Sequence, residues 1–274
     1  MRLQEQVVLI TGGSRGVGAA VARAVAREGA HVALAGKTME PHPRLPGTLG
    51  EVAEEIRGMG QQALAIQTDI RFPDQVEAMV AATMERFGRI DALINNAGAI
   101  YWGTTTEFPA KRYDLVMDVN VRGAFLCSQA VIPHMRERGG HIVMMSPPIN
   151  PKAAVGKAPY IISKFGMTMV GMAIDAEEPS IAAHALWPIT GIRTAATVNL
   201  GMGDDSEWRR PEILADSTVE LLVKDPTECT FKAWLDEDVL ATAGITDLEP
   251  YSCVPGSTPE PMSIVLVDPD WKRE

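Results

Sequence analysis

Residues 7–18 read VVLITGGSRGVG, an apolar run that stops at a glycine-rich turn. The apolar residues Val7–Ile10 predict a buried strand, and the next helical stretch begins inside the turn. Glycine lets the backbone approach a ligand closely, and a helix N-terminus offers free N–H groups and a positive dipole end. The order of strand, turn and helix therefore predicts a phosphate site. The spacing Gly12-x-x-x-Gly16-x-Gly18 is not the common G-x-G-x-x-G, and the glycines alone would equally fit a structural turn.

The same alternation of apolar runs and helical stretches continues along the chain. Further strands are predicted at His31–Gly36, Ala63–Asp69, Ala92–Asn95, His141–Ser146, Ala183–Trp187 and Ser263–Val267. Helices are predicted at Gly16–Glu28, Leu49–Met59, Asp74–Phe87, Pro109–Met135 and Lys157–Glu178. Such strands suit a parallel sheet covered on both faces and built from right-handed βαβ units. Arg210–Glu249 reads as a helix and an irregular stretch, too small for a second domain, so we expect one domain over residues 1–274.

Composition narrows the class of protein. The chain has 274 residues, 46% of them hydrophobic, and a net charge of −10. An acidic surface disfavours nucleic acid and anionic membranes as partners. The three cysteines are far apart, and neither they nor the five histidines show a metal-ligand spacing, so we expect no disulfide and no metal. The polar start and the lack of an apolar run of about 18 residues predict a cytoplasmic enzyme.

Two segments interrupt the alternation of strands and helices. Thr38–Thr48 is a Pro-rich insertion, and Thr194–Pro211 has no clear period. Long irregular loops beside strand ends often form lids or substrate walls, and mobile surface loops are the alternative.

The end of the second predicted strand bears on cofactor choice. Sites that prefer NAD usually place a carboxylate there, about 20 residues after the glycine turn, against the ribose 2′-hydroxyl. Here the chain reads Gly36-Lys37-Thr38, and Arg15 lies in the glycine turn. Two cations suit a 2′-phosphate, so we predict NADP(H), with NAD(H) as the alternative if Lys37 is merely solvated. The fourth strand ends in Asn95–Gly98, small and amide-bearing residues that suit a wall beside the adenosine ribose.

Tyr160 and Lys164 are four residues apart in a predicted helix, so their side chains share one face. A phenol beside an ammonium group is a tuned proton donor, because the cation lowers the pKa of the phenol from about 10. A buried Tyr beside a surface Lys is the alternative when the pair is taken alone.

These segments resemble, in order, the motifs of the short-chain dehydrogenase/reductase family. TGGSRGVG looks like its TGxxxGxG turn, Asn95–Gly98 like its NNAG and Tyr160–Lys164 like its YxxxK. Asn120 and Ser146 lie where this family has its catalytic Asn and Ser. The resemblance runs from about Leu3 to Val267. KTMEPHPRLPGT, SPP and LWPITGIRTAA further resemble a branch of hydroxysteroid dehydrogenase-like and citronellol/citronellal dehydrogenase-like proteins.

The resemblance implies an α/β fold: a single Rossmann-like domain with seven parallel strands ordered 3-2-1-4-5-6-7 and helices on both faces. It implies hydride transfer between NAD(P) and a carbonyl or alcohol. Tyr160 would be the general acid/base, Lys164 would lower its pKa and hold the nicotinamide ribose, and Ser146 would bind the substrate oxygen. Asn120 would hold a water between Lys164 and solvent. The full set of cofactor contacts expected is Gly12, Ser14, Arg15, Gly16, Val17, Gly18, Lys37, Asp69, Ile70, Asn96, Ala97, Gly98, Tyr160, Lys164, Pro188, Thr190 and Thr194.

Two departures from the family pattern affect the site. Pro188-Ile189 replaces the usual Pro-Gly, so the loop near the nicotinamide must run differently, and either Thr190 or Thr194 would reach the carboxamide. Pro147 and Pro148 remove two N–H donors beside Ser146. With the Met, Leu and Trp residues of Thr194–Trp208, they favour a hydrophobic small-molecule substrate such as a terpenoid, a fatty acyl derivative or a sterol-like compound.

The resemblance also implies a homodimer or homotetramer. A second hypothesis of another class is a dinucleotide-binding sensor or scaffold without catalysis. Its signature would be a broken catalytic set, whereas Asn120, Ser146, Tyr160 and Lys164 are all present. An epimerase or dehydratase with the same fold is a third hypothesis.

Overall fold

A computed structural model describes residues 1–41, 46–148 and 155–261 of the chain. Within these residues seven parallel strands form one sheet in the order β3-β2-β1-β4-β5-β6-β9. The strands are β1 Val7–Thr11, β2 His31–Gly36, β3 Ala63–Gln67, β4 Ala92–Asn95, β5 Gly140–Met145, β6 Ile181–Trp187 and β9 Lys232–Leu235. The predicted α/β class and the Rossmann-like sheet are confirmed.

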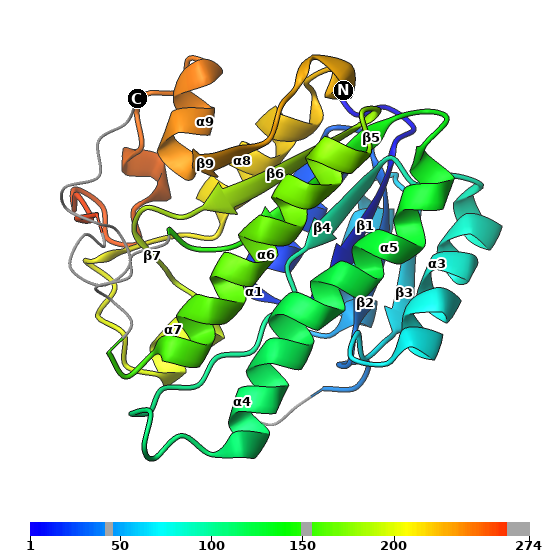
Figure 1. Ribbon diagram of the computed structural model, residues 1–274. Coiled ribbons are helices and arrows are strands. Elements are labelled where there is room, and N and C mark those ends of the chain that lie inside the picture. The colour runs from blue at the N-terminus through cyan, green and yellow to red at the C-terminus, as the bar shows by residue number, and fades with distance from the viewer. Residues whose placement is uncertain (42–45, 149–154, 262–274) are drawn as a thin grey trace.

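Helices cover both faces of this sheet (Figure 1). Successive side chains of a strand point to opposite faces. Val8 and Ile10 of β1 therefore join one core cluster, while Leu9 joins the other. The first cluster lies under α1 Gly16–Arg27, α2 Leu49–Gly58, α8 Glu212–Leu222 and α9 Asp236–Thr242. The second lies under α3 Pro73–Phe87, α5 Ala124–Met135 and α6 Ala158–Glu177.

Local signals explain where several helices begin and end. Thr48 and Glu51 form a capping box at the start of α2: Glu51 N donates to Thr48 Oγ1 and Thr48 N donates to Glu51 Oε2. Pro73 opens α3, where a missing N–H costs nothing, and Gly88 ends it at a φ of 73°. These predicted helix bounds agree with the structure to within about two residues.

The seventh strand comes from an unexpected part of the chain. β9 pairs with β6 in parallel, from His184 beside Lys232 to Trp187 beside Leu235. The expected last strand, Ser263–Val267, lies outside the described residues. β9 instead arises within Arg210–Glu249, which was expected to hold only a helix and an irregular stretch. Four residues that run directly into the helix Asp236–Thr242 carry too weak a period to be recognised from sequence.

The predicted helix Pro109–Met135 is present but is not regular throughout. It runs as α4 Ala110–Met117, a π-helical turn η1 Asp118–Gly123, and α5. A π turn inserts one residue into the helix and is frequent at functional sites. Asn120 lies in it.

By length and composition alone, the run Ala110–Met135 is long and apolar enough to cross a membrane, because an 18-residue window of it has a mean hydropathy of 1.3. This corrects the expectation that no stretch reaches that length. Its α5 part packs against β4, β5 and α6, so we interpret the run as a helix of the domain core.

The segment after β6 is less irregular than expected. β7 Gly191–Ile192 pairs with β8 Trp208–Arg209, and α7 Ala195–Asn199 lies between them. Two short 3₁₀ turns, η3 Pro226–Glu228 and η4 Glu249–Tyr251, follow later. The small β7–β8 sheet thus holds the segment beside the carboxyl end of the main sheet.

Candidate active site

In the glycine turn between β1 and α1, the backbone lies very close to neighbouring groups. Gly12 has a φ of 70°, and a Cβ on Gly18 would lie 2.4 Å from the Gly12 carbonyl oxygen and 2.5 Å from Asn96 Nδ2. Asn96 Nδ2 donates to the carbonyl oxygens of Thr11 and Gly12, at 2.9 and 3.1 Å. The end of β4 is thereby tied to the turn, and no side chain fits at position 18.

The turn opens onto a cavity of about 550 Å³. α1 begins at Gly16 without a side-chain cap, so backbone N–H groups of its first turn are left for another partner. Twelve predicted cofactor residues line this cavity: Gly12, Ser14, Arg15, Gly16, Val17, Lys37, Asp69, Ile70, Asn96, Ala97, Gly98 and Thr194. Gly18 packs beneath the turn and does not line it.

Three charged side chains line this cavity, namely Arg15, Lys37 and Asp69. Arg15 Nη2 donates to Thr38 Oγ1 and to the Gly47 carbonyl oxygen, and its buried Nε has no partner among the described residues. Lys37 Nζ is 3.9 Å from Asp69 Oδ2 and the side chain is largely exposed. The Arg71 guanidinium binds Asp69 at 2.6 Å and holds the pKa of that carboxyl below its usual range. The Pro-rich insertion reaches the site through Gly47; its residues 42–45 lie outside the described part.

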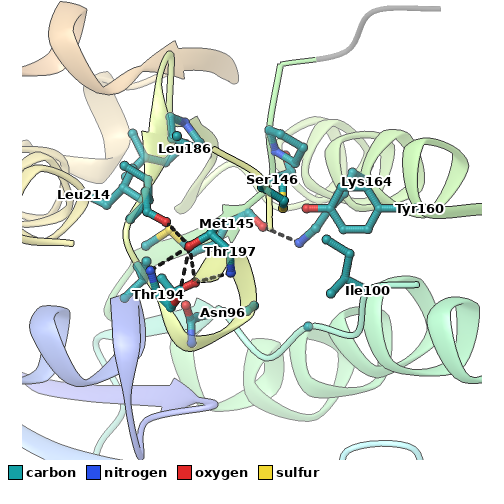
Figure 2. A pocket seen from close by; sticks show the side chains of 18 of the residues that line it. Asn96, Ile100, Met145, Ser146, Tyr160, Lys164, Leu186, Thr194, Thr197 and Leu214 are labelled. Carbon is teal, nitrogen blue, oxygen red and sulfur yellow. Dashed lines mark hydrogen bonds between the residues drawn. The ribbon is translucent and has the colours of Figure 1, made fainter. Parts of the chain in front are cut away.

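A second cavity of about 260 Å³ lies next to the first and contains Tyr160, Lys164 and Ser146. Figure 2 shows these three side chains on one side of the pocket, with Thr194 and Thr197 opposite them and the Tyr160 hydroxyl pointing inward. Pro188, Thr190 and Thr194 also line it, and Thr194 borders both cavities. Three predicted catalytic residues and most of the predicted cofactor residues therefore line two adjoining cavities at the carboxyl ends of the strands, whereas Asn120 and Gly18 line neither.

Lys164 is buried and donates from Nζ to the Met145 carbonyl oxygen at 2.7 Å. Burial lowers its pKa from 10.5 to about 8. Its Nζ lies 5.9 Å from the centre of the Tyr160 ring, whose edge contacts the Trp102 ring. Burial raises the pKa of the Tyr160 phenol well above 10. The expected lowering by Lys164 is therefore wrong for the protein alone, because the loss of water around the phenol outweighs an ammonium group that is bound elsewhere.

Ser146 is buried at the end of β5 and its Oγ has two partners. Trp187 Nε1 donates to it at 2.9 Å, and Thr168 Oγ1 lies 3.1 Å away. Neither partner was predicted from sequence, although Trp187 stands at the carboxyl end of a predicted strand. The position of Trp187 at that strand end was the signal in the sequence that could have identified it.

Asn120 connects the loop after β4 to α6. Its Oδ1 accepts from Ala99 N at 2.7 Å, and its Nδ2 donates to the Ala99 carbonyl oxygen and to Ser163 Oγ. An amide side chain has two donors and two acceptor positions, so one acceptor position on Oδ1 remains for another group. The predicted link from Asn120 through a water to Lys164 stays a prediction.

A buried carboxyl group holds the loop after β6 through a hydrogen bond. Ile189 N donates to Asp236 Oδ1 at 3.2 Å, and Asp236 is fully buried at the start of α9. Ile189 is not among the residues with positive φ, so the loop follows a course that suits a β-branched side chain. Thr190 donates to the Gly191 carbonyl oxygen, whereas Thr194 caps α7. The role of Asp236 was also not predicted from the sequence, because no neighbouring residue indicates it.

Comparison with known proteins gives consistent matches. A family model described as short chain dehydrogenase matches residues 6–201. Hydroxysteroid dehydrogenase-like protein 2 of Xenopus tropicalis is 42% identical over 91% of this chain and 61% of its own length. A solved short chain dehydrogenase of Mycobacterium thermoresistibile is 45% identical over 94% of each chain, with a TM-score of 0.88. A solved structure from Xanthomonas campestris is 41% identical with a TM-score of 0.91, covering 95% of this chain and 98% of that one. This chain thus spans about 61% of the length of the curated relative.

Proposed function

Because the chain belongs to the short-chain dehydrogenase family, whose members are NAD(P)-dependent oxidoreductases of CH–OH groups, we propose that Tyr160 supplies the proton in interconverting an alcohol and a carbonyl. The observation that carries the proposal is the meeting of Tyr160, Lys164 and Ser146 in one cavity that adjoins the glycine-turn cavity. Each of these side chains offers a proton or a hydrogen bond to a substrate oxygen.

The dinucleotide fits the residues present. Gly12 and Gly18 leave a cradle that a Cβ would fill, and Arg15 Nε is a buried donor without a partner among the described residues. Gly12, Ser14, Gly16 and Val17 would meet the pyrophosphate, while Pro188 and Thr190 or Thr194 would meet the nicotinamide. Thr194 is favoured over Thr190 because it borders both cavities.

When bound, the nicotinamide supplies or accepts the hydride. Tyr160 gives its proton to the carbonyl oxygen during reduction and takes it back during oxidation. Ser146 donates to the same oxygen and stabilises the negative charge that develops there. Lys164 holds the ribose and supplies positive charge near the phenol.

The experiment is NADPH oxidation with a panel of carbonyl substrates, comparing wild type with Tyr160→Phe. Removing a general acid costs about 10²–10⁴-fold in rate, so we expect at least a hundredfold loss. Tyr113→Phe, on the exposed face of α4, is the matched control and keeps full activity. Unchanged activity in Tyr160→Phe would defeat this mechanism, whereas NADPH binding without turnover of any substrate by wild type would support the alternative of a catalytically silent dinucleotide-binding sensor or scaffold.

NADP(H) is the preferred cofactor in this proposal. Lys37 and Arg15 lie at the end of the cavity where the adenosine ribose would sit, and Lys37 already has an anion, Asp69, 3.9 Å away. A charged hydrogen bond contributes about 1.5–3 kcal/mol, so Lys37→Ala should weaken NADPH binding by about 10–100-fold and barely change NADH binding. Arg23→Ala, which removes an exposed cation from helix α1, is the control. A wild-type enzyme that prefers NADH would contradict this assignment.

The substrate is proposed to be an uncharged hydrophobic molecule. Ile100, Met145, Leu186, Met202 and Leu214 line the smaller cavity, and Lys164 is its one described cation. An apolar wall favours burial of apolar surface, and one cation that already donates to the Met145 carbonyl oxygen compensates little of the cost of burying a carboxylate or phosphate. A sugar or charged carbonyl turning over fastest in the panel would overturn this choice.

A second copy of the chain is the proposed partner, as a homodimer or homotetramer. Ile162, Phe165, Met169 and Met172 are about half exposed on α6, and Phe125 is likewise exposed on α5. The spacing of the four α6 residues places them on one face of the helix. The helix α6 lies on the outside of the sheet (Figure 1), and its exposed apolar face suits burial against another copy. A cytoplasmic location completes the proposal.

A further inference from the structure

Ser146 belongs to a short chain of hydrogen bonds that continues behind the pocket wall. Trp187 Nε1 at the end of β6 donates to Ser146 Oγ at 2.9 Å. Thr168 Oγ1 on α6 lies 3.1 Å from the same oxygen, where either hydroxyl can be the donor, and it can also donate to the Lys164 carbonyl oxygen at 3.3 Å. Ser146 lines the cavity, but Trp187 and Thr168 do not. Both therefore reach the substrate oxygen only through Ser146.

The hydrogen-bonding capacity of these groups limits how they are arranged. A serine hydroxyl has one hydrogen and two acceptor positions, whereas an indole N–H only donates. Trp187 therefore fills one acceptor position of Ser146 Oγ. Thr168 has one hydrogen and two oxygen neighbours, and Ser146 Oγ is the nearer of them. If that hydrogen points at Ser146, both acceptor positions are filled.

We infer that Trp187 and Thr168 are positioning residues that fill the acceptor positions of Ser146 and turn its one hydrogen toward the substrate oxygen. The inference rests on the proposed function. Two donors on the same oxygen also polarise its O–H bond, because hydrogen bonds in a chain strengthen one another. Ser146 is then a pre-aimed donor that needs no reorientation as charge develops on the substrate oxygen.

The first test is Trp187→Phe, which keeps an aromatic ring and removes the N–H donor. Loss of a direct oxyanion donor costs about 10²–10³-fold in kcat, so misaiming it should lower kcat by about tenfold, with the Kd for NADPH unchanged. Trp234→Phe is the matched control, because the indole nitrogen of Trp234 has no partner among the described residues. We expect its kcat to equal wild type.

Thr168 gives an independent test at the other acceptor position. Thr168→Val keeps the shape of the side chain and removes the hydroxyl, so kcat should fall, whereas Thr168→Ser should restore it. This pair also decides the matter if Trp187→Phe fails to fold. Equal kcat in Thr168→Val and Thr168→Ser would overturn the role of Thr168.

A double-variant comparison separates positioning from a general packing role. In a Ser146→Ala background there is no hydroxyl to aim, so adding Trp187→Phe should lower kcat no further. A further tenfold loss in that background, or an unchanged kcat in Trp187→Phe alone, would overturn the inference. If Ser146→Ala itself had full activity, the proposed function of Ser146 would fail instead, and the two failures are thereby distinguished.

Discussion

Position 18 leaves no room for a side chain. Gly18 faces the Gly12 carbonyl oxygen and Asn96 Nδ2 at distances that a Cβ essentially never shows. The amide that crowds it also joins β4 to the turn. The geometry of the dinucleotide cavity therefore depends on the absence of a side chain at position 18.

We predict that Gly18→Ala displaces the turn and weakens NADPH binding by about tenfold or more, which corresponds to about 1.4 kcal/mol. Gly58→Ala, at the end of α2 with nothing within 4 Å of the added carbon, is the matched control and leaves binding unchanged. Fluorescence titration of NADPH measures both variants. Equal affinity in the two would contradict the close approach described for the turn.

Lys164 gives the site a pH dependence. Its buried ammonium group has a pKa of about 8, below the usual 10.5. The charge that assists the proposed proton transfer is present below that pH and is lost above it. We predict that kcat/KM for carbonyl reduction falls as pH rises through about 8, since this parameter reports groups of the free enzyme.

Lys164→Arg tests the assignment, because a guanidinium keeps its charge to far higher pH. The fall in kcat/KM should move to higher pH in this variant, even if its maximum is lower. An unchanged inflection near pH 8 would assign the titration to another group. Tyr160 shows what sequence reasoning missed here: the Tyr–Lys spacing was visible, but the burial that raises the pKa of the phenol was not.

At the scale of elements, the loop after β6 is held by a distant part of the chain. Asp236 accepts from Ile189 N and from Glu237 N through Oδ1, and its buried Oδ2 has no partner among the described residues. Burial raises the pKa of Asp236 from 3.8 to about 7. The carboxyl that anchors the pocket wall is thus protonated in the folded protein at mildly acidic pH.

This shift predicts a pH-dependent stability. The folded protein binds the proton more tightly than the unfolded chain, so the contribution is present in full below about pH 4 and is lost as pH rises through about 7. Asp236→Asn cannot titrate. The stability of wild type relative to this variant should therefore decrease from about pH 4 to about pH 7, as measured by urea unfolding. Parallel stability curves over that range would contradict the shift.

Sequence predicted best the elements with local signals. The strands β1 to β6 and the helices α1, α2, α3 and α6 follow from apolar runs, caps and glycine stops. β9 was not predicted, because its place beside β6 depends on a long-range pairing that the sequence of four residues does not indicate. The π turn at Asn120 was also missed, since a single extra residue in a helix hardly alters its apolar pattern.

At the scale of the whole molecule, five exposed large apolar side chains lie on the two neighbouring helices α5 and α6. Phe125, Ile162 and Phe165 are each about half exposed there. The sequence predicted an oligomer only by resemblance, whereas these exposed side chains offer a physical reason for one. We predict that Phe165→Asp shifts the protein toward the monomer, because it would bury a charge in the interface.

Size-exclusion chromatography with light scattering measures the mass of both forms. Met59→Asp, exposed at the end of α2 on the other face of the sheet, is the control and keeps the wild-type mass. A wild-type protein that is already a monomer would contradict the proposed assembly, and so would an unchanged oligomer in Phe165→Asp. The substrate stayed beyond prediction for a similar reason: its cavity is assembled from β5, β6, α6 and α7, which only the fold brings together.

The central claim is that one carbonyl group receives a hydride from the cofactor in the larger cavity and a proton from Tyr160 in the smaller one. The most direct measurement uses NADPH deuterated on the nicotinamide C4 and follows the product by mass spectrometry. Wild type should place deuterium on the former carbonyl carbon of the preferred substrate, and Tyr160→Phe should bind the cofactor but transfer at least a hundredfold more slowly. Tight NADPH binding with no deuterium in any product, or transfer at an equal rate in Tyr160→Phe, would contradict the account.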